Sequence, residues 1–297
     1  MNPGRPVILG TRGSRLALAQ SSACAQRLRS AGLAVEVRII KTTSEHHPDL
    51  PLSVIDQRDV FTRQLDEALL LGQIDLAVHS AKDVPIEVPE GIALTAITER
   101  HDPSDVLVSD AGWDVDGLPE GAVVATSSLR RRAQLLHRRP DLRIVDIRGN
   151  VDTRVRKMRE GQADALVLAR AGLERLFLDV PHTVVSPEIM LPAVGQGALA
   201  IATLEEHPLR ETIHEALDHE LTVHAVRAER AMMGALEGGC RVPVGALGRV
   251  VDDTRLWLQG VVASIDGALL YRGEAVGEEP EEVGGRLARE LLGQGAA

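Results

Sequence analysis

A lysine and an aspartate stand side by side where a short apolar run ends. Leu76-Ala77-Val78 leads into His79-Ser80-Ala81-Lys82-Asp83, and Pro85 then restrains the backbone. In open α/β sheets, ligands bind beyond the carboxyl ends of the strands. The stretch therefore predicts a buried strand that delivers an ammonium group and a carboxylate to a site, although an ordinary surface ion pair would show the same pattern.

Serine and arginine side chains follow other strand-like segments in the same way. If those segments form parallel sheets, the side chains face one crevice, and a positive crevice in a chain of net charge −10 indicates an anionic ligand. The set comprises Arg12 and Ser14, then Ser128, Arg130 and Arg131, then Arg148 with Arg154 one helical turn further on, and finally Arg170 and Arg175.

The run Thr126–Arg132 sharpens this expectation. Ser128 suits a helix N-cap, but arginines in the first turn oppose the helix dipole. Their position is favourable if an anion binds at the helix N-terminus, where guanidinium groups can also grip carboxylates in bidentate fashion. A solvated basic face is the alternative interpretation.

The two cysteines differ in their surroundings. Cys240 follows Gly238 and Gly239, which predicts an adaptable loop, and the neighbouring Arg241 favours the thiolate. The residues alone leave a reactive or modified cysteine and a half-buried inert one equally open. Cys24 lies on the apolar stripe of a predicted helix, which indicates core packing. No spacing of cysteine and histidine predicts a metal site.

Composition limits the classes of function. A chain of 297 residues exceeds the usual size of a single hydrophobic core, so two or three domains are expected. The aromatic content of 2% and the negative net charge argue against binding to nucleic acid or to an anionic membrane. No apolar run approaches membrane-spanning length, and the cysteine pattern indicates a soluble protein of the cytoplasm.

Strand-like and helical segments alternate over the first 200 residues, which predicts two units with parallel sheets. Strands are expected at 6–10, 35–40, 76–78 and 92–97 in the first unit, and at 106–108, 122–125, 142–147 and 163–168 in the second. Residues 181–192 are expected to be a connector, after which 198–202 returns to the first unit. Helices are expected at 15–30 and 61–72. Two more are expected in the second unit, one that ends at Arg138 and one that ends at Gly161. From about residue 217 a helix, three strands and a last helix at 280–292 predict a small α+β domain.

Taken together, these segments resemble the hydroxymethylbilane synthase family, also called porphobilinogen deaminase. The resemblance implies two lobes like type II periplasmic binding proteins, with mixed, mainly parallel sheets, and a small α+β C-terminal domain. It places lobe 1 at 1–99 and 198–216, lobe 2 at 100–197, and the cofactor-anchoring domain at 217–297. The matching segments are Thr11–Ser14, Val78–Pro85, Thr126–Arg131, Arg148–Val151 with Thr153 and Arg154, Leu191–Ala198, and Leu236–Cys240.

The resemblance also implies a reaction. The family condenses four porphobilinogen molecules head to tail into linear hydroxymethylbilane and releases ammonia, in tetrapyrrole and haem biosynthesis. Its dipyrromethane cofactor would be joined by a thioether to Cys240, and Asp83 would be the catalytic carboxylate. Lys82, Asp83, Ser128, Arg130 and Arg131 would bind the cofactor, and Arg12, Ser14, Arg148, Arg154 and Arg175 would bind the substrate. A monomer without metal, nucleotide or redox cofactor is expected.

The chain departs from the family pattern in one region. Before Phe61 the family usually shows Gly-Lys-Gly-Leu-Phe, where this chain has Gln57-Arg58-Asp59-Val60-Phe61. Gln64 replaces an acidic residue, and Ser44-Glu45 replaces a usual Gly-Asp. These differences concern loop closure and control of chain length more than the core chemistry. They also suggest a second hypothesis, a non-catalytic carboxylate-binding or sensor protein on the same two-lobe fold.

Overall fold

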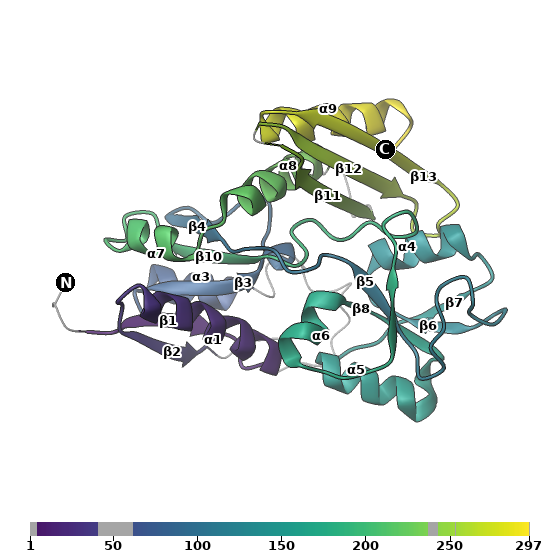
Figure 1. The fold of residues 1–297 in the computed structure, drawn as a ribbon, viewed down its shortest axis with the longest axis horizontal. Helices are drawn as coiled ribbons and strands as arrows, with labels where there is room; N and C mark the ends of the chain where they lie inside the picture. The colour runs from purple at the N-terminus through teal and green to yellow at the C-terminus, as the bar shows by residue number, and fades with distance from the viewer. Residues whose placement is uncertain (1–4, 41–61, 237–242, 253, 297) are drawn as a thin grey trace. The chain divides into compact units, whose positions relative to one another are not determined.

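The computed structural model describes residues 5–40, 62–236, 243–252 and 254–296. The chain divides into two compact units (Figure 1). The first contains residues 1–100 and 198–223, and the second contains residues 101–197 and 224–297. The chain therefore passes from the first unit to the second and later returns, and it then enters the second unit again.

A five-stranded sheet forms the centre of the first unit, in the order β2-β1-β3-β10-β4. β1 pairs in parallel with β2 and β3, whereas β10 lies antiparallel between β3 and β4. The strands are β1 (Val7–Thr11), β2 (Val35–Ile39), β3 (Leu76–Ser80), β4 (Ile92–Ile97) and β10 (Leu199–Leu204). Because β3 is central and covered on both faces, its first four residues are all buried.

Helices cover both faces of this sheet. On one face, α1 (Arg15–Ser30) and α7 (Arg210–Leu217) bury Cys24, Leu28 and Ile213 against β1 and β3. On the other face, α3 (Arg63–Leu70) buries Leu65 and Leu69. Cys24 is 2% exposed, so its predicted role in core packing is confirmed. No element was expected from the sequence over the residues of α7.

The second unit contains a sheet with the same arrangement, in the order β7-β6-β8-β5-β9. β6 is parallel to β7 and β8, and β5 is antiparallel to β8 and β9. The elements are β5 (Asp105–Val108), β6 (Val123–Ala125), α4 (Leu129–Arg138), β7 (Arg143–Val145), α5 (Val151–Lys157), η2 (Met158–Gln162), β8 (Ala165–Ala169), α6 (Arg170–Leu176) and β9 (His182–Val185). β9 lies where a connector was expected at 181–192. It is a four-residue edge strand, too short to show a clear alternation.

The remainder of the second unit is an antiparallel meander with two helices, the first of which begins in the last residues of the first unit. The elements are α8 (Glu220–Leu236), β11 (Val244–Val250), β12 (Leu256–Ala263), β13 (Leu270–Gly277) and α9 (Pro280–Gly293). Met232, Leu258 and Leu287 form its core. Gly284 lets α9 approach α8, because a side chain there would collide with the backbone of Ala228.

These three sheets confirm the predicted mixed α/β class with a small α+β part. Parallel pairings do not outnumber antiparallel ones in the five-stranded sheets, since each sheet receives one strand from a crossing segment in the antiparallel direction. The boundaries of the three-domain division at 99, 197 and 216 stay predictions. None of the helices that the structure describes is long and apolar enough to cross a membrane.

Candidate active site

Four predicted site residues of the first unit follow two neighbouring strands. Arg12 and Ser14 come after β1, and Lys82 and Asp83 come after β3. β1 and β3 are parallel, with Leu9 opposite Leu76 in the register, so their carboxyl ends lie at the same edge of the sheet. The structure therefore brings these four residues to one edge, as the strand pattern predicted.

Lys82 and Asp83 lie on η1 (Ala81–Asp83), a single 3₁₀ turn that the backbone holds at both ends. The amide of Ala81 donates to the carbonyl of Ala198 at 3.0 Å, and the amide of Val84 donates back to the Ala81 carbonyl at 3.3 Å. Ala81 and Val84 are buried, whereas Lys82 is exposed and Asp83 is half-buried. The turn is thus anchored by its small and apolar residues and presents its charged ones.

Both serines of the predicted site are helix N-caps. The hydroxyl of Ser14 accepts a hydrogen bond from the amide of Ala17 at 3.2 Å at the start of α1. The hydroxyl of Ser128 accepts one from the amide of Arg131 at 3.4 Å at the start of α4. A capping hydroxyl still has its own proton to donate, so each serine can cap its helix and bind a carboxylate at once.

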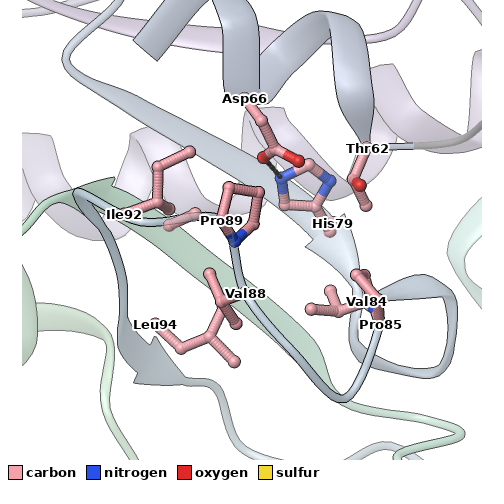
Figure 2. A pocket seen from close by; sticks show the side chains of 10 residues that line it. Thr62, Asp66, His79, Val84, Pro85, Val88, Pro89, Ile92 and Leu94 are labelled. Carbon is pink, nitrogen blue, oxygen red and sulfur yellow. Dashed lines mark ion pairs between the residues drawn. The ribbon is translucent and has the colours of Figure 1, made fainter. Parts of the chain in front are cut away.

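A small cavity lies behind η1, and Figure 2 shows His79 and Asp66 pointing toward each other within it. Its volume of about 10 Å³ is at the lower limit for one water molecule, so it cannot hold a pyrrole. Nε2 of His79 is buried without a hydrogen-bond partner and lies 3.9 Å from the nearer oxygen of Asp66. Burial, with a smaller contribution from Arg12, lowers the pKa of His79 to about 4.

This buried histidine predicts a loss of stability in mild acid. Histidine in an unfolded chain titrates near pH 6.5, so the unfolded state takes up the proton first as the pH falls. The contribution of neutral His79 is complete above pH 6.5 and is lost between pH 6.5 and 4, amounting to about 3 kcal/mol. Urea midpoints of the native protein and of His79→Gln, measured at pH 7 and pH 4.5, should show a smaller acid loss in the variant. An equal loss in both proteins would contradict the assignment.

The predicted site residues of the second unit also gather at one sheet edge. Ser128, Arg130 and Arg131 follow β6, Arg148 and Arg154 follow β7, and Arg175 lies on α6 after β8. Because β6 is parallel to both β7 and β8, the carboxyl ends of all three strands meet. The second unit therefore concentrates guanidinium groups where its sheet can bind a ligand.

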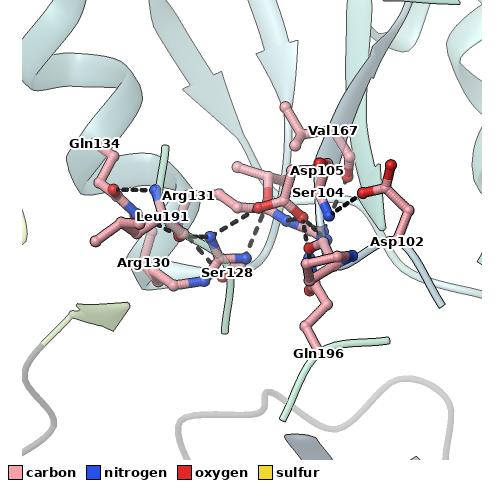
Figure 3. Close-up of polar contacts among 12 residues, drawn as sticks. Asp102, Ser104, Asp105, Ser128, Arg130, Arg131, Gln134, Val167, Leu191 and Gln196 are labelled. Carbon is pink, nitrogen blue, oxygen red and sulfur yellow. Dashed lines mark hydrogen bonds and ion pairs between the residues drawn. The ribbon is translucent and has the colours of Figure 1, made fainter. Parts of the chain in front are cut away.

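Arg130 and Arg131 of α4 are buried, and their partner is a carboxylate that the sequence patterns did not indicate (Figure 3). Nε and Nη2 of Arg131 donate to Oδ1 of Asp105 at 3.1 and 2.7 Å. Nη1 of Arg130 lies 2.7 Å from Oδ2, an ion pair without the alignment of a full hydrogen bond. The carboxylate of Asp105 therefore balances part of the positive charge of these two arginines within the protein. An anionic ligand at this helix N-terminus stays a prediction.

Three further arginines make contacts to the backbone or to acidic side chains. Nε of Arg154 donates to the Gly149 carbonyl at 2.7 Å, and Nη2 of Arg175 donates to the Gly197 carbonyl at 2.6 Å. Arg170 forms ion pairs with Asp102 and Glu174, at 2.7 and 2.8 Å. The expected ligand-binding set, which does not include Arg170, stays a prediction. Cys240 and the unusual segment before Phe61 lie outside the described residues.

Comparison with known proteins agrees with the motifs. Residues 7–212 match the family model described as "Porphobilinogen deaminase, dipyromethane cofactor binding domain". Residues 223–293 match the one described as "Porphobilinogen deaminase, C-terminal domain". The chain belongs to the porphobilinogen deaminase family. The family, the transferase class and the dipyrromethane cofactor that the motifs implied are thereby confirmed.

Similar porphobilinogen deaminases cover nearly the whole chain. The porphobilinogen deaminase of Rubrobacter xylanophilus is 68% identical over 292 residues, which are 98% of this chain and 95% of that protein. That of Desulforudis audaxviator is 49% identical, with 98% and 96% covered. Among solved structures, the periplasmic VFT2 domain of Bordetella pertussis BvgS is 19% identical, with a TM-score of 0.43, over 71% of this chain and 86% of that one.

The residues at the start of α4 suit the porphobilinogen deaminase cofactor. Arg130 and Arg131 bring two positive charges and Asp105 brings one negative charge, so one positive charge remains buried without compensation within this cluster. A buried net charge is costly unless it is paired. A carboxylate, of the kind that each ring of a dipyrromethane carries, would neutralise it. The donors of the cluster therefore fit this cofactor.

Proposed function

We propose that this protein condenses four porphobilinogen molecules head to tail into linear hydroxymethylbilane and releases one ammonia at each step. What supports this most directly is one observation. In a chain of the porphobilinogen deaminase family, a half-buried carboxylate, Asp83, follows the carboxyl end of β3, a central strand of the first sheet. Clustered arginines follow the corresponding strand ends of the second sheet.

Asp83 would be the catalytic carboxylate. Loss of ammonia from the substrate leaves an electron-poor, cationic pyrrole, and a fixed carboxylate near the ring N–H stabilises that charge and assists proton transfer. The anchored turn of η1 supplies the required fixation, since its ends are held by backbone hydrogen bonds at 3.0 and 3.3 Å. Lys82, on the same turn, would bind a cofactor carboxylate.

The remaining polar residues would bind carboxylates. Each porphobilinogen carries an acetate and a propionate, and guanidinium groups bind such groups through paired hydrogen bonds. Ser128, Arg130 and Arg131 would hold the dipyrromethane, which supplies the pyrrole end to which the first substrate is joined. Arg12, Ser14, Arg148, Arg154 and Arg175 would hold the substrate and the growing chain. Cys240 would carry the thioether.

The expected monomer and the cytoplasmic location belong to the same proposal. The chain has a low aromatic content, which disfavours a broad hydrophobic interface, and its cysteine pattern is not that of a disulfide framework. Light scattering on the purified protein would give the molecular mass in solution, and a mass of twice 31.9 kDa would reject the monomer.

An ammonia assay separates this function from the non-catalytic alternative. We expect the purified protein, incubated with porphobilinogen, to release one ammonia for each porphobilinogen consumed and to yield one hydroxymethylbilane for every four. Protein inactivated by heat serves as the control. Tight binding of porphobilinogen without any ammonia release would reject the enzyme and support a carboxylate sensor.

A further inference from the structure

The carboxylate of Asp105 is the common partner of several donors in the second unit. Asp105 is fully buried at the start of β5, and its backbone is paired on both sides, with Ala169 of β8 and Val185 of β9. Its side chain contacts Arg130 and Arg131, and its Oδ1 also accepts a hydrogen bond from Nε2 of Gln196 at 2.9 Å. Asp105 is therefore held by the sheet and holds the two arginines in turn.

The electrostatics show that Asp105 stays ionised. Burial alone would raise the pKa of its carboxyl, but the charges of Arg130 and Arg131 outweigh burial and hold the pKa well below its usual range. Burial also lowers the pKa of the Arg130 guanidinium. Removing one partner from such a buried cluster leaves an uncompensated charge, which is far more costly than losing a surface ion pair.

The contacts also determine which way the guanidinium groups face. Nη1 of Arg130 contacts both Asp105 and the Leu191 carbonyl, the latter at 2.6 Å. Nη1 of Arg131 donates to the Val167 carbonyl at 3.0 Å. For Arg130, the contacts within the described residues all come from Nη1, so its Nε and Nη2 remain for a ligand. Asp105 thus fixes one edge of this guanidinium while the opposite edge keeps its donors.

We propose that Asp105 is a positioning residue, which sets Arg130 and Arg131 in place to receive carboxylates of the dipyrromethane. This inference rests on the proposed cofactor-binding role of these arginines. Without Asp105, two like charges at the start of one helix would repel each other and adopt other rotamers. Binding the cofactor would then also have to order two long side chains, at a cost in conformational entropy. In the native protein, the ion pairs with Asp105 have already ordered them.

The test compares Asp105→Asn with Asp116→Asn. Asp116 is a matched control, because it also pairs with an arginine of α4, at 2.7 Å from Arg138, but on the surface. Intact mass gives the fraction of protein that carries the dipyrromethane, and thermal melting shows that the protein is folded. We expect the loaded fraction of folded Asp105→Asn to fall at least tenfold, and that of Asp116→Asn to equal the native value.

Two further variants remove ambiguity. If Asp105→Asn does not fold, Asp105→Glu keeps the charge but displaces the arginines, and its loaded fraction should still fall below the native value. Arg130→Gln tests the underlying assignment, since normal loading of that variant would reject the cofactor role of the arginine itself. A purely structural role for Asp105 predicts a lower melting temperature with normal loading of the folded protein. If folded Asp105→Asn loads normally while Arg130→Gln cannot load, the positioning role of Asp105 is overturned and the cofactor role of Arg130 stands.

Discussion

Replacing Asp83 with asparagine is expected to lower kcat by a factor of about 10²–10⁴, the usual contribution of a positioned acid–base group. The amide keeps the size of the carboxylate and one of its two acceptor oxygens, but it can neither balance a cationic pyrrole nor accept its proton. Since Asp83 is only half-buried, the melting temperature should change little. Initial rates of ammonia release at saturating porphobilinogen give kcat directly.

Glu87→Gln provides the matched control for this experiment. Glu87 is an exposed carboxylate four residues further along the same connection, so its neutralisation changes the net charge by the same amount. Its kcat should stay within about twofold of the native value. If Asp83→Asn also turned over at a near-native rate, Asp83 would lose its proposed catalytic role, whatever its effect on substrate affinity.

The second large effect concerns Cys240. Cys240→Ser should abolish both the mass increment of two pyrrole units and the turnover, because a serine hydroxyl is a far weaker nucleophile than a thiolate and forms no thioether. Intact mass spectrometry of the purified variant measures the adduct, and the rate of ammonia release measures the turnover.

Cys24→Ala is the control for this second prediction. Cys24 packs in the core of the first unit and is 2% exposed, so its loss should cost some stability but leave the adduct in place. An unmodified Cys240 in a fully active native protein would refute the tether. If Cys24→Ala lost the adduct while Cys240→Ser still carried it, the cofactor would be attached to Cys24, and the proposed attachment to Cys240 would be wrong.

Local patterns were sufficient to predict the strand and the helix N-cap beside which candidate site residues lie. The apolar run 76–78 predicted β3, and the polar cluster behind it became the anchored turn with Lys82 and Asp83. The serine before three arginines likewise predicted the N-cap of α4. These signals are readable because a strand, its end and the following cap all lie within a dozen residues.

Long-range features were not predictable in this way. Asp105 precedes its arginine partners by 25 and 26 residues, and an acidic residue at the head of a short strand looks like part of the preceding turn. The antiparallel place of β10 between β3 and β4 depends on strand pairing across about 100 residues, which no local spacing reports. Short elements such as β9 and α7 gave too few periods for a pattern to emerge.

The position of β10 also bears on the order in which newly made protein can fold. The first unit lacks the strand between β3 and β4 until residue 204 has been translated, 107 residues after β4 ends. At synthesis rates of about 5–20 residues per second, that wait lasts roughly 5–20 seconds. The five strands of the other large sheet are complete at residue 185. The lobe that leaves the ribosome first is therefore the later of the two to close its sheet, which reverses the usual N-terminal-first order.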